Sequence, residues 1–167
     1  MGRRRAPWFA LGGLFVIWAT GWAMVAEAWS AIPADYRPSS VEIVASPGLV
    51  LFGVVGTLVL ARLGGNPIGW ILFGIGAAEC VGAAALGYGM QALFARPAWP
   101  GEAAALWLVS TGWAPVVLVA TLLLVLLFPD GRLPSRAFRP WAFLAIGIGV
   151  VATLGTMFAS GPNYDVP

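Results

Sequence analysis

Five long apolar stretches constrain this chain more than any other feature of its sequence. A helix that crosses the hydrocarbon core of a bilayer needs roughly 20 mostly apolar residues, because the core is about 30 Å thick and each residue rises about 1.5 Å. Five segments meet this requirement, namely residues 8–28, 43–63, 68–94, 103–128 and 141–160. The sequence therefore predicts five transmembrane spans.

The composition agrees with a membrane protein. Hydrophobic residues make up 60% of the chain and charged residues only 10%, whereas charged residues are about 25% of a soluble domain. Lipid offers no hydrogen-bond partner to a peptide group, so long apolar runs without two-residue alternation indicate helices rather than barrel strands. We expect an all-α, polytopic membrane protein whose 167 residues form a single transmembrane domain, a bundle of five helices.

The distribution of arginine predicts the orientation of this bundle. Every basic residue is an arginine, and the connections between the predicted spans are alternately rich and poor in it. One side carries seven arginines, and the other side carries two: Arg3, Arg4, Arg5, Arg62, Arg132, Arg136 and Arg139 against Arg37 and Arg96. Because arginine-rich loops stay in the cytoplasm, we expect the N-terminus to be cytoplasmic.

A cleaved signal peptide is the competing interpretation of the N-terminus. MGRRR precedes an apolar run and the small residues AEA at positions 26–28, as in a secretory signal. The apolar run is longer than the 7–15 residues of such signals. We therefore expect an uncleaved membrane anchor.

Several classes of function are excluded by what the sequence lacks. It has no histidine for general base catalysis or zinc, no glycine-rich phosphate loop with a lysine, and a single cysteine, Cys80, within an apolar stretch. Its arginines form short clusters beside apolar spans rather than a solvated face, so nucleic acid is not an expected partner. We expect no catalytic activity, no cofactor and no metal site, with the lipid bilayer as the main partner.

Glu79 is the one acidic residue deep in a predicted span. A charge at the middle of a bilayer costs at least roughly 2–3 kcal/mol, so this carboxyl should face protein or water, or be protonated. One interpretation is a proton- or ligand-sensing group. The other is a hydrogen-bond partner for a side chain of the fourth span, such as Ser110, Thr111 or Trp113. The neighbours of Glu79 at helical spacing are the small residues Gly76, Gly82 and Ala83, and Gly74, Ala78 and Gly82 form a stripe nearby, so this face can pack closely against another helix.

Pro115 is a candidate hinge in the fourth span. A proline inside a helix removes one backbone hydrogen bond and favours a kink, and Ser110 and Thr111 could satisfy the freed carbonyl groups. Two interpretations are open: the kink is a hinge about which the helix moves, or it only sets the shape of the helix.

Two motifs resemble a known class of membrane region. GNPIGWILFGIG at residues 65–76 and LLFPDGRLPSRAFRPW at residues 126–141 are similar, in this order and at about this separation, to the N-terminal membrane regions of sensor histidine kinases from actinobacteria and related bacteria. The resemblance implies a sensory input module of a two-component system, a multi-pass protein of the bacterial plasma membrane. It also implies a homodimer that passes an envelope or lipid-phase signal to a cytoplasmic kinase, with the stimulus unspecified.

In both motifs the residues that carry the resemblance belong to expected cytoplasmic turns. They are Asn66, Pro67, Gly69 and Trp70 in the first motif and Pro129, Asp130, Gly131 and Arg132 in the second. Asn66 would cap a helix whose first turn holds Pro67, Trp70 would anchor near the interface, and Asp130 would bond turn amides or pair with Arg132.

The sequence also departs from the kinase pattern. Without histidine it has no phosphoacceptor, and it has no ATP-binding region. We therefore expect a fragment of a longer chain, in which a short outer segment, one more apolar helix and the kinase region follow Pro167. The alternatives are a small transporter or channel subunit that uses Glu79, and a structural membrane protein without a ligand.

Overall fold

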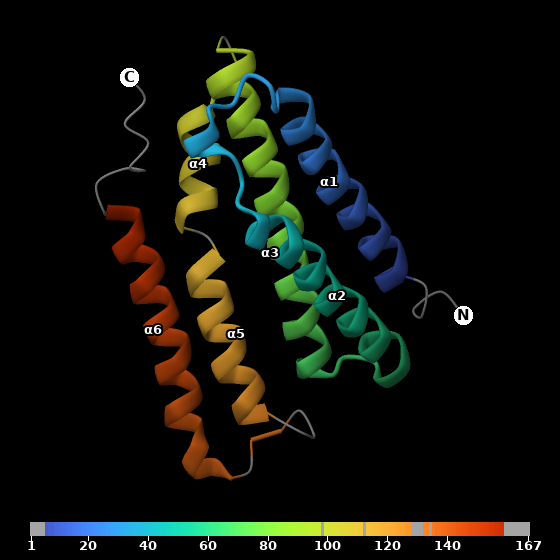
Figure 1. Cartoon of the computed structure of the whole chain (residues 1–167). Helices are drawn as coiled ribbons and strands as arrows, with labels where there is room; N and C mark the ends of the chain where they lie inside the picture. Colours follow the sequence, from blue (N-terminus) through green and yellow to red (C-terminus); the bar gives the residue numbers. More distant parts are fainter. Residues whose placement is uncertain (1–5, 98, 112, 128–131, 134, 159–167) are drawn as a thin grey trace.

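The structure, a computed structural model, describes residues 6–97, 99–111, 113–127, 132–133 and 135–158 (Figure 1). Its long helices are α1 (Ala6–Ala28), α2 (Ser40–Leu63), α3 (Pro67–Met90), α4 (Glu102–Thr111), α5 (Trp113–Leu127) and α6 (Arg139–Phe158). Short 3-10 helices, η2 (Ala34–Tyr36) and η4 (Arg136–Phe138), precede α2 and α6, and a π-helical turn, η3 (Gln91–Ala95), extends α3. The described residues form no strand. The all-α prediction is confirmed.

Among the described residues, three helical segments are long and apolar enough to cross a membrane: Ala6–Ala28, Ala34–Leu63 and Pro67–Ala95. They correspond to the first three predicted spans. The fourth predicted span contains α4 and α5 on either side of residue 112, and the fifth contains α6. Residues 112, 128, 159 and 160 lie outside the described part of the chain. Five membrane crossings and a cytoplasmic N-terminus therefore stay predictions.

The second helix begins earlier than the apolar run from which it was predicted. Ser39 and Glu42 form a capping box, in which the Ser39 hydroxyl accepts a hydrogen bond from the Glu42 amide at 3.2 Å and the Glu42 carboxylate accepts one from the Ser39 amide at 2.7 Å. This reciprocal pair satisfies amides that would otherwise lack partners at a helix start. As a result Ser46 lies in the second turn of α2 rather than in its first turn.

α3 is the central helix of the bundle. It packs against α1 and α2 on one side and against α4 and α5 on the other, and α6 packs against α5 (Figure 1). α1 and α3 approach so closely that a methyl group added at Gly21 would overlap the backbone of Ala83, and one at Gly87 would overlap the backbone of Gly21. Only residues without a side chain permit such an approach.

The small-residue face of α3 was predicted correctly at Gly76 and Ala83 but wrongly at the stripe that contains Gly74 and Gly82. A methyl group at Gly74 or Gly82 would meet no atom within 4 Å, whereas Gly76 faces Gly53 of α2 backbone to backbone. Packing runs along Gly69, Gly76, Ala83 and Gly87, the positions at which α3 is buried against α2 and then α1. The stripe was misplaced because small residues occupy several faces of this glycine-rich helix.

The ends of the helices gather into two groups. The α2–α3 turn lies at the same end of the bundle as η4, and the end of α1 and η2 lie at the opposite end with the end of α3 (Figure 1). A buried apolar cluster of Val25, Ala28, Ile32 and Met90 lies beneath that opposite end. The chain can therefore alternate between two sides, as multiple membrane crossings require.

Candidate functional site

A polar cluster lies where α1, α2 and α3 meet, and Ser46 is its centre. The indole N–H groups of Trp18 and Trp22 donate hydrogen bonds to the Ser46 hydroxyl oxygen at 2.8 and 2.9 Å. The Ser46 hydroxyl in turn donates to Oε1 of Glu79. Ser46 is buried, with 4% of its surface exposed. Three helices are thus joined through one hydroxyl group.

The hydrogen-bonding capacity of Ser46 is fully used. A hydroxyl group has one proton and two acceptor lone pairs, and an indole N–H can only donate. The two tryptophans therefore occupy both lone pairs, which leaves the hydroxyl proton for Glu79. Glu79 must then act as an acceptor at Oε1, a role open to a carboxylate and to the carbonyl oxygen of a carboxylic acid.

Local sequence explains how these four side chains reach one another. Trp18 and Trp22 are four residues apart on α1, so they share one face of that helix. Glu79 lies between Gly76 and Ala83, the two positions at which α3 touches α2 and α1 closely. Gly21, next to Trp22, permits the backbone of α1 to approach α3. Close packing of the backbones brings the polar side chains within bonding distance.

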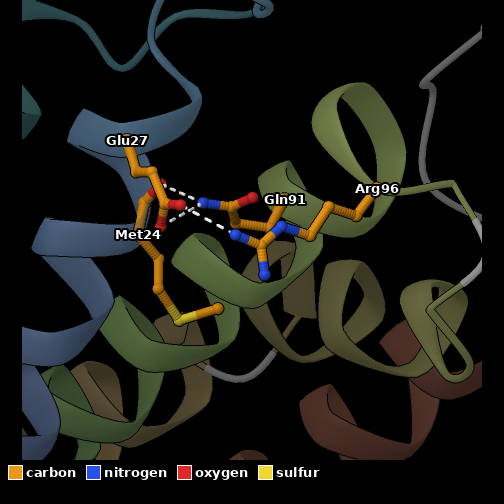
Figure 2. Close-up of polar contacts among 4 residues, drawn as sticks. All are labelled: Met24, Glu27, Gln91 and Arg96. Atoms are coloured by element: carbon orange, nitrogen blue, oxygen red, sulfur yellow. Dashed lines mark hydrogen bonds and ion pairs between the residues drawn. The ribbon is translucent and has the colours of Figure 1, made fainter.

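A second polar cluster joins α1 to the turn after α3. Figure 2 shows Gln91 and Arg96 pointing toward Glu27 near the end of α1. The Gln91 amide donates to the carbonyl of Met24 at 3.1 Å and to Oε2 of Glu27 at 3.0 Å, and Arg96 forms an ion pair with Oε1 of Glu27 at 2.8 Å. Gln91 is 1% exposed, whereas the side chains of Arg96 and Glu27 are 48% and 60% exposed. The cluster thus has a buried amide and a solvated ion pair.

Both arginines at this end stack on tryptophan rings. Arg96 lies 5.0 Å from the ring centroid of Trp99, and Arg37 lies 5.2 Å from that of Trp29. Arg37 also donates to the carbonyl of Ile32 at 3.0 Å. Both cations therefore have specific partners, consistent with anchored loops rather than with a free basic surface.

Ser110 was one of the residues predicted to form a hydrogen bond with Glu79, and this prediction is wrong. The Ser110 hydroxyl donates to the carbonyl of Trp107, in its own helix, at 3.1 Å. The side chains of Thr111, Trp113 and Pro115 lie outside those that the structure describes. Thr111 and Pro115 belong to α4 and α5 respectively, and the hinge at Pro115 stays a prediction.

The residues that sequence reasoning missed are Ser46, Trp18, Trp22 and Gln91. No role was predicted for Ser46 within the second predicted span, and the two tryptophans were not distinguished from the seven others. One available signal was their spacing of four residues, which places two indole donors on one face of an otherwise apolar helix. Gln91 had a signal too, since an uncharged amide at the end of an apolar span needs partners when it is buried.

The first turn motif has the expected local geometry. Gly64 and Gly65 have positive φ angles of 48° and 77°, which favour glycine, and end α2. Asn66 is the N-cap of α3, with its side chain accepting from the Ile68 amide at 2.8 Å, and Pro67 occupies the first turn.

Two further residues of this motif differ in exposure. Gly69 is buried against the side chains of Val59 and Leu60. Trp70 is 58% exposed, with its ring edge-on to Phe73. Trp70 is therefore free to contact lipid or headgroups.

The second turn motif lies mostly outside the described residues. Pro129, Asp130 and Gly131 are not described, and Arg132 is exposed. The pairing of Asp130 with Arg132 therefore stays a prediction. After this segment Ser135 caps η4, accepting from the Ala137 amide at 3.3 Å.

Comparison of the chain with family models, with curated proteins and with solved structures found no match. Among the described residues, no three acidic or thiol side chains lie close enough to hold a metal ion.

Proposed function

We propose that this chain is the membrane-embedded sensory module of a bacterial two-component sensor histidine kinase. It lies in the plasma membrane as a multi-pass protein, and as part of a kinase it is expected to form a homodimer. The module passes an envelope or lipid-phase signal to a cytoplasmic output domain that this sequence does not contain.

The Ser46 cluster is the observation that carries this proposal. A hydroxyl bonded to three side chains from α1 and α3 responds to any sliding or rotation among α1, α2 and α3, because a shift of about 1 Å breaks a hydrogen bond. Such a cluster has a small set of discrete arrangements, which is what a switching element requires. The two turn motifs supply the resemblance to kinases in particular.

A sensory role also fits the small size of the connections. Residues 29–39 and 96–101 lack the material for a separate ligand-binding domain. A stimulus for this protein therefore acts on the lipid-facing helices or on these short loops.

A transporter or channel subunit is less well supported. Glu79 is held by Ser46, and no other described acid lies deep in α1, α2 or α3. A proton or ion path needs a series of polar groups across the membrane.

The test begins with the reading frame that follows the codon for Pro167. The proposal requires one further apolar helix and then a region with the phosphoacceptor histidine and nucleotide-binding glycines. The full-length protein in membrane vesicles should autophosphorylate with ATP, and Ser46→Ala should change the rate severalfold while Ser110→Ala leaves it unchanged. A stop codon directly after Pro167 would reject the kinase assignment, and equal rates in all three proteins would reject a role for the cluster.

A further inference from the structure

An apolar groove lies between α3, α5 and α6, on the side of the bundle away from α1. It has a volume of about 460 Å³, and its lining includes Ile71 of α3, Ala120 and Leu123 of α5, and Ile146, Val150 and Leu154 of α6. Every residue that lines it is apolar. The volume lies within the range of roughly 300–1,000 Å³ found for small-molecule sites.

The shape of the groove fits a hydrocarbon chain. From Ile146 to Leu154 the lining of α6 extends over eight residues, or about 12 Å along the helix axis. A lipid acyl chain is narrow and apolar, and it is the molecule that surrounds such helices in a bilayer.

Three arginines lie near one end of the groove. Arg132, Arg136 and Arg139 are exposed, and none of them makes an ion pair with an acid among the described residues. Arg139 is the first residue of α6 and lies seven residues, or about 10 Å, before the lining residue Ile146. An extended arginine side chain covers much of that distance.

The residues of α3 and α5 that line the groove also lie near this end of the bundle. Leu123 lies four residues before the end of α5, and Ile71 lies four residues after the start of α3. Figure 1 shows that the start of α3, the end of α5 and η4 lie together at one end of the bundle. The end of the groove is thus about one helical turn from the expected membrane surface.

Charge complementarity identifies the lipid that suits this arrangement. Guanidinium groups bind phosphate oxygens with paired hydrogen bonds, and basic residues beside a membrane attract anionic headgroups. A zwitterionic headgroup adds a positive amine that gains nothing here. Trp141, 61% exposed at the start of α6, supplies an aromatic side chain suited to the interface.

We propose that the groove and the arginines before α6 form a binding site for one anionic phospholipid. Its acyl chain lies against Leu123, Ile146 and Val150, and its phosphate is held by Arg136 and Arg139. The site rests on α5 and α6 lying in the bilayer with α1 to α3. It does not depend on any signalling activity, and so its failure would leave the kinase assignment untouched.

Native mass spectrometry of the detergent-solubilised protein tests this site. The protein is titrated with phosphatidylglycerol and, separately, with phosphatidylcholine of the same acyl chains. We expect one phosphatidylglycerol molecule to bind in clear preference to phosphatidylcholine. Replacing both Arg136 and Arg139 with glutamine should weaken phosphatidylglycerol binding about 30-fold and largely remove its preference over phosphatidylcholine.

Two further variants separate the groove from general charge. Val150→Trp fills the groove from a position that is 53% exposed, so it should fold and bind both lipids more weakly. Arg62→Gln removes an exposed arginine at the same end but on α2, and it should retain the preference. Circular dichroism and gel filtration establish that each variant is folded. Equal binding of both lipids to the wild type, an unchanged preference in the double variant, or an equal loss in Arg62→Gln would overturn the site.

Discussion

The Ser46 hydroxyl of α2 donates a hydrogen bond to the carboxyl group of Glu79 on α3, while two indole groups of α1 donate to the same hydroxyl oxygen. The pair is separated by 33 positions in the chain. Most interhelical polar contacts join two helices, whereas this one joins three, and its effects on stability should exceed those of a single hydrogen bond.

Ser46→Ala is therefore expected to destabilise the bundle. It removes three hydrogen bonds and leaves two indole N–H groups and one carboxyl oxygen without this partner. Intramembrane hydrogen bonds contribute about 0.6 kcal/mol each on average, so we expect a loss of about 2 kcal/mol in the free energy of unfolding. Unfolding in mixed detergent micelles, followed by tryptophan fluorescence, measures it.

Ser110→Ala is the matched control for this change. Ser110 is exposed, and its hydroxyl donates to the carbonyl of Trp107 in its own helix. Its removal should change the free energy of unfolding by less than about 0.5 kcal/mol. Equal losses in the free energy of unfolding of Ser46→Ala and Ser110→Ala would show that the Ser46 contact stabilises the bundle no more than a hydrogen bond within one helix.

Substitutions of Glu79 should differ in how far they lower accumulation in membranes, according to whether the new side chain can accept a hydrogen bond from the Ser46 hydroxyl. Glu79→Gln keeps a carbonyl oxygen and should accumulate in membranes as the wild type does. Glu79→Lys can only donate, and both acceptor lone pairs of Ser46 are already occupied by Trp18 and Trp22. Its accumulation, measured by immunoblot of the membrane fraction, should fall severalfold. A lysine variant at normal levels would mean that this position faces water, and would favour transport.

Because α1 packs closely on α3, replacement of Gly21 by alanine should lower the stability of the fold, whereas the same replacement at Gly12 should not. Gly21→Ala places a methyl group against the backbone of Ala83, and such overpacking costs about 1–3 kcal/mol. Gly12→Ala, on the same helix, meets no atom within 4 Å and should not destabilise the fold. Thermal unfolding of both variants in detergent gives the comparison. Tolerance of alanine at Gly21 would show that the helices lie further apart.

The stability contributed by the cluster of Glu27, Gln91 and Arg96 should depend more on the Gln91 amide than on the ion pair. Gln91→Leu deprives the Met24 carbonyl and Glu27 of a buried donor, with an expected cost of about 1–3 kcal/mol. Arg96→Gln breaks an ion pair between half-exposed side chains, worth about 0.2–1 kcal/mol and weakened by salt. Unfolding at low and high ionic strength distinguishes the two. A greater loss from the arginine variant would contradict this ranking.

The orientation of the bundle is open to direct measurement. Cys80 is buried, and its replacement by serine gives a background without thiols. Single cysteines are then placed at Ser39, the N-cap of α2, and at Ser135, the N-cap of η4. An impermeant maleimide applied to intact cells should label position 39 and spare position 135, because arginine-rich segments stay in the cytoplasm. The reverse pattern, or labelling of both, would overturn the cytoplasmic N-terminus.

Hydropathy and turn chemistry predicted the features that depend on short stretches of sequence. The first three helices follow from apolar length, and the Asn66 cap follows from the order glycine, glycine, asparagine, proline. The start of α2 was missed because the capping box of Ser39 and Glu42 consists of polar residues outside the apolar run.

The partners of Glu79 could not be predicted in the same way. Its position in an apolar span shows that it needs a partner, but which side chain serves depends on how three helices rotate about their axes. That rotation is set by backbone contacts such as Gly53 with Gly76. Glycine is frequent on every face of α3, so its pattern did not distinguish the packed face from the open one.

The π-helical turn η3 makes the contact of Gln91 and Arg96 with Glu27 sensitive to the number of residues in this part of the chain. The Arg96 amide bonds to the carbonyl of Gln91, five residues earlier, at 2.6 Å. In a continuous α-helix residues 91 and 96 would point about 140° apart, yet here both reach Glu27. The additional residue of a π turn changes the direction in which the chain continues. Homologous chains should therefore tolerate exchanges of residue type between Ala92 and Ala95 more readily than the deletion of a single residue.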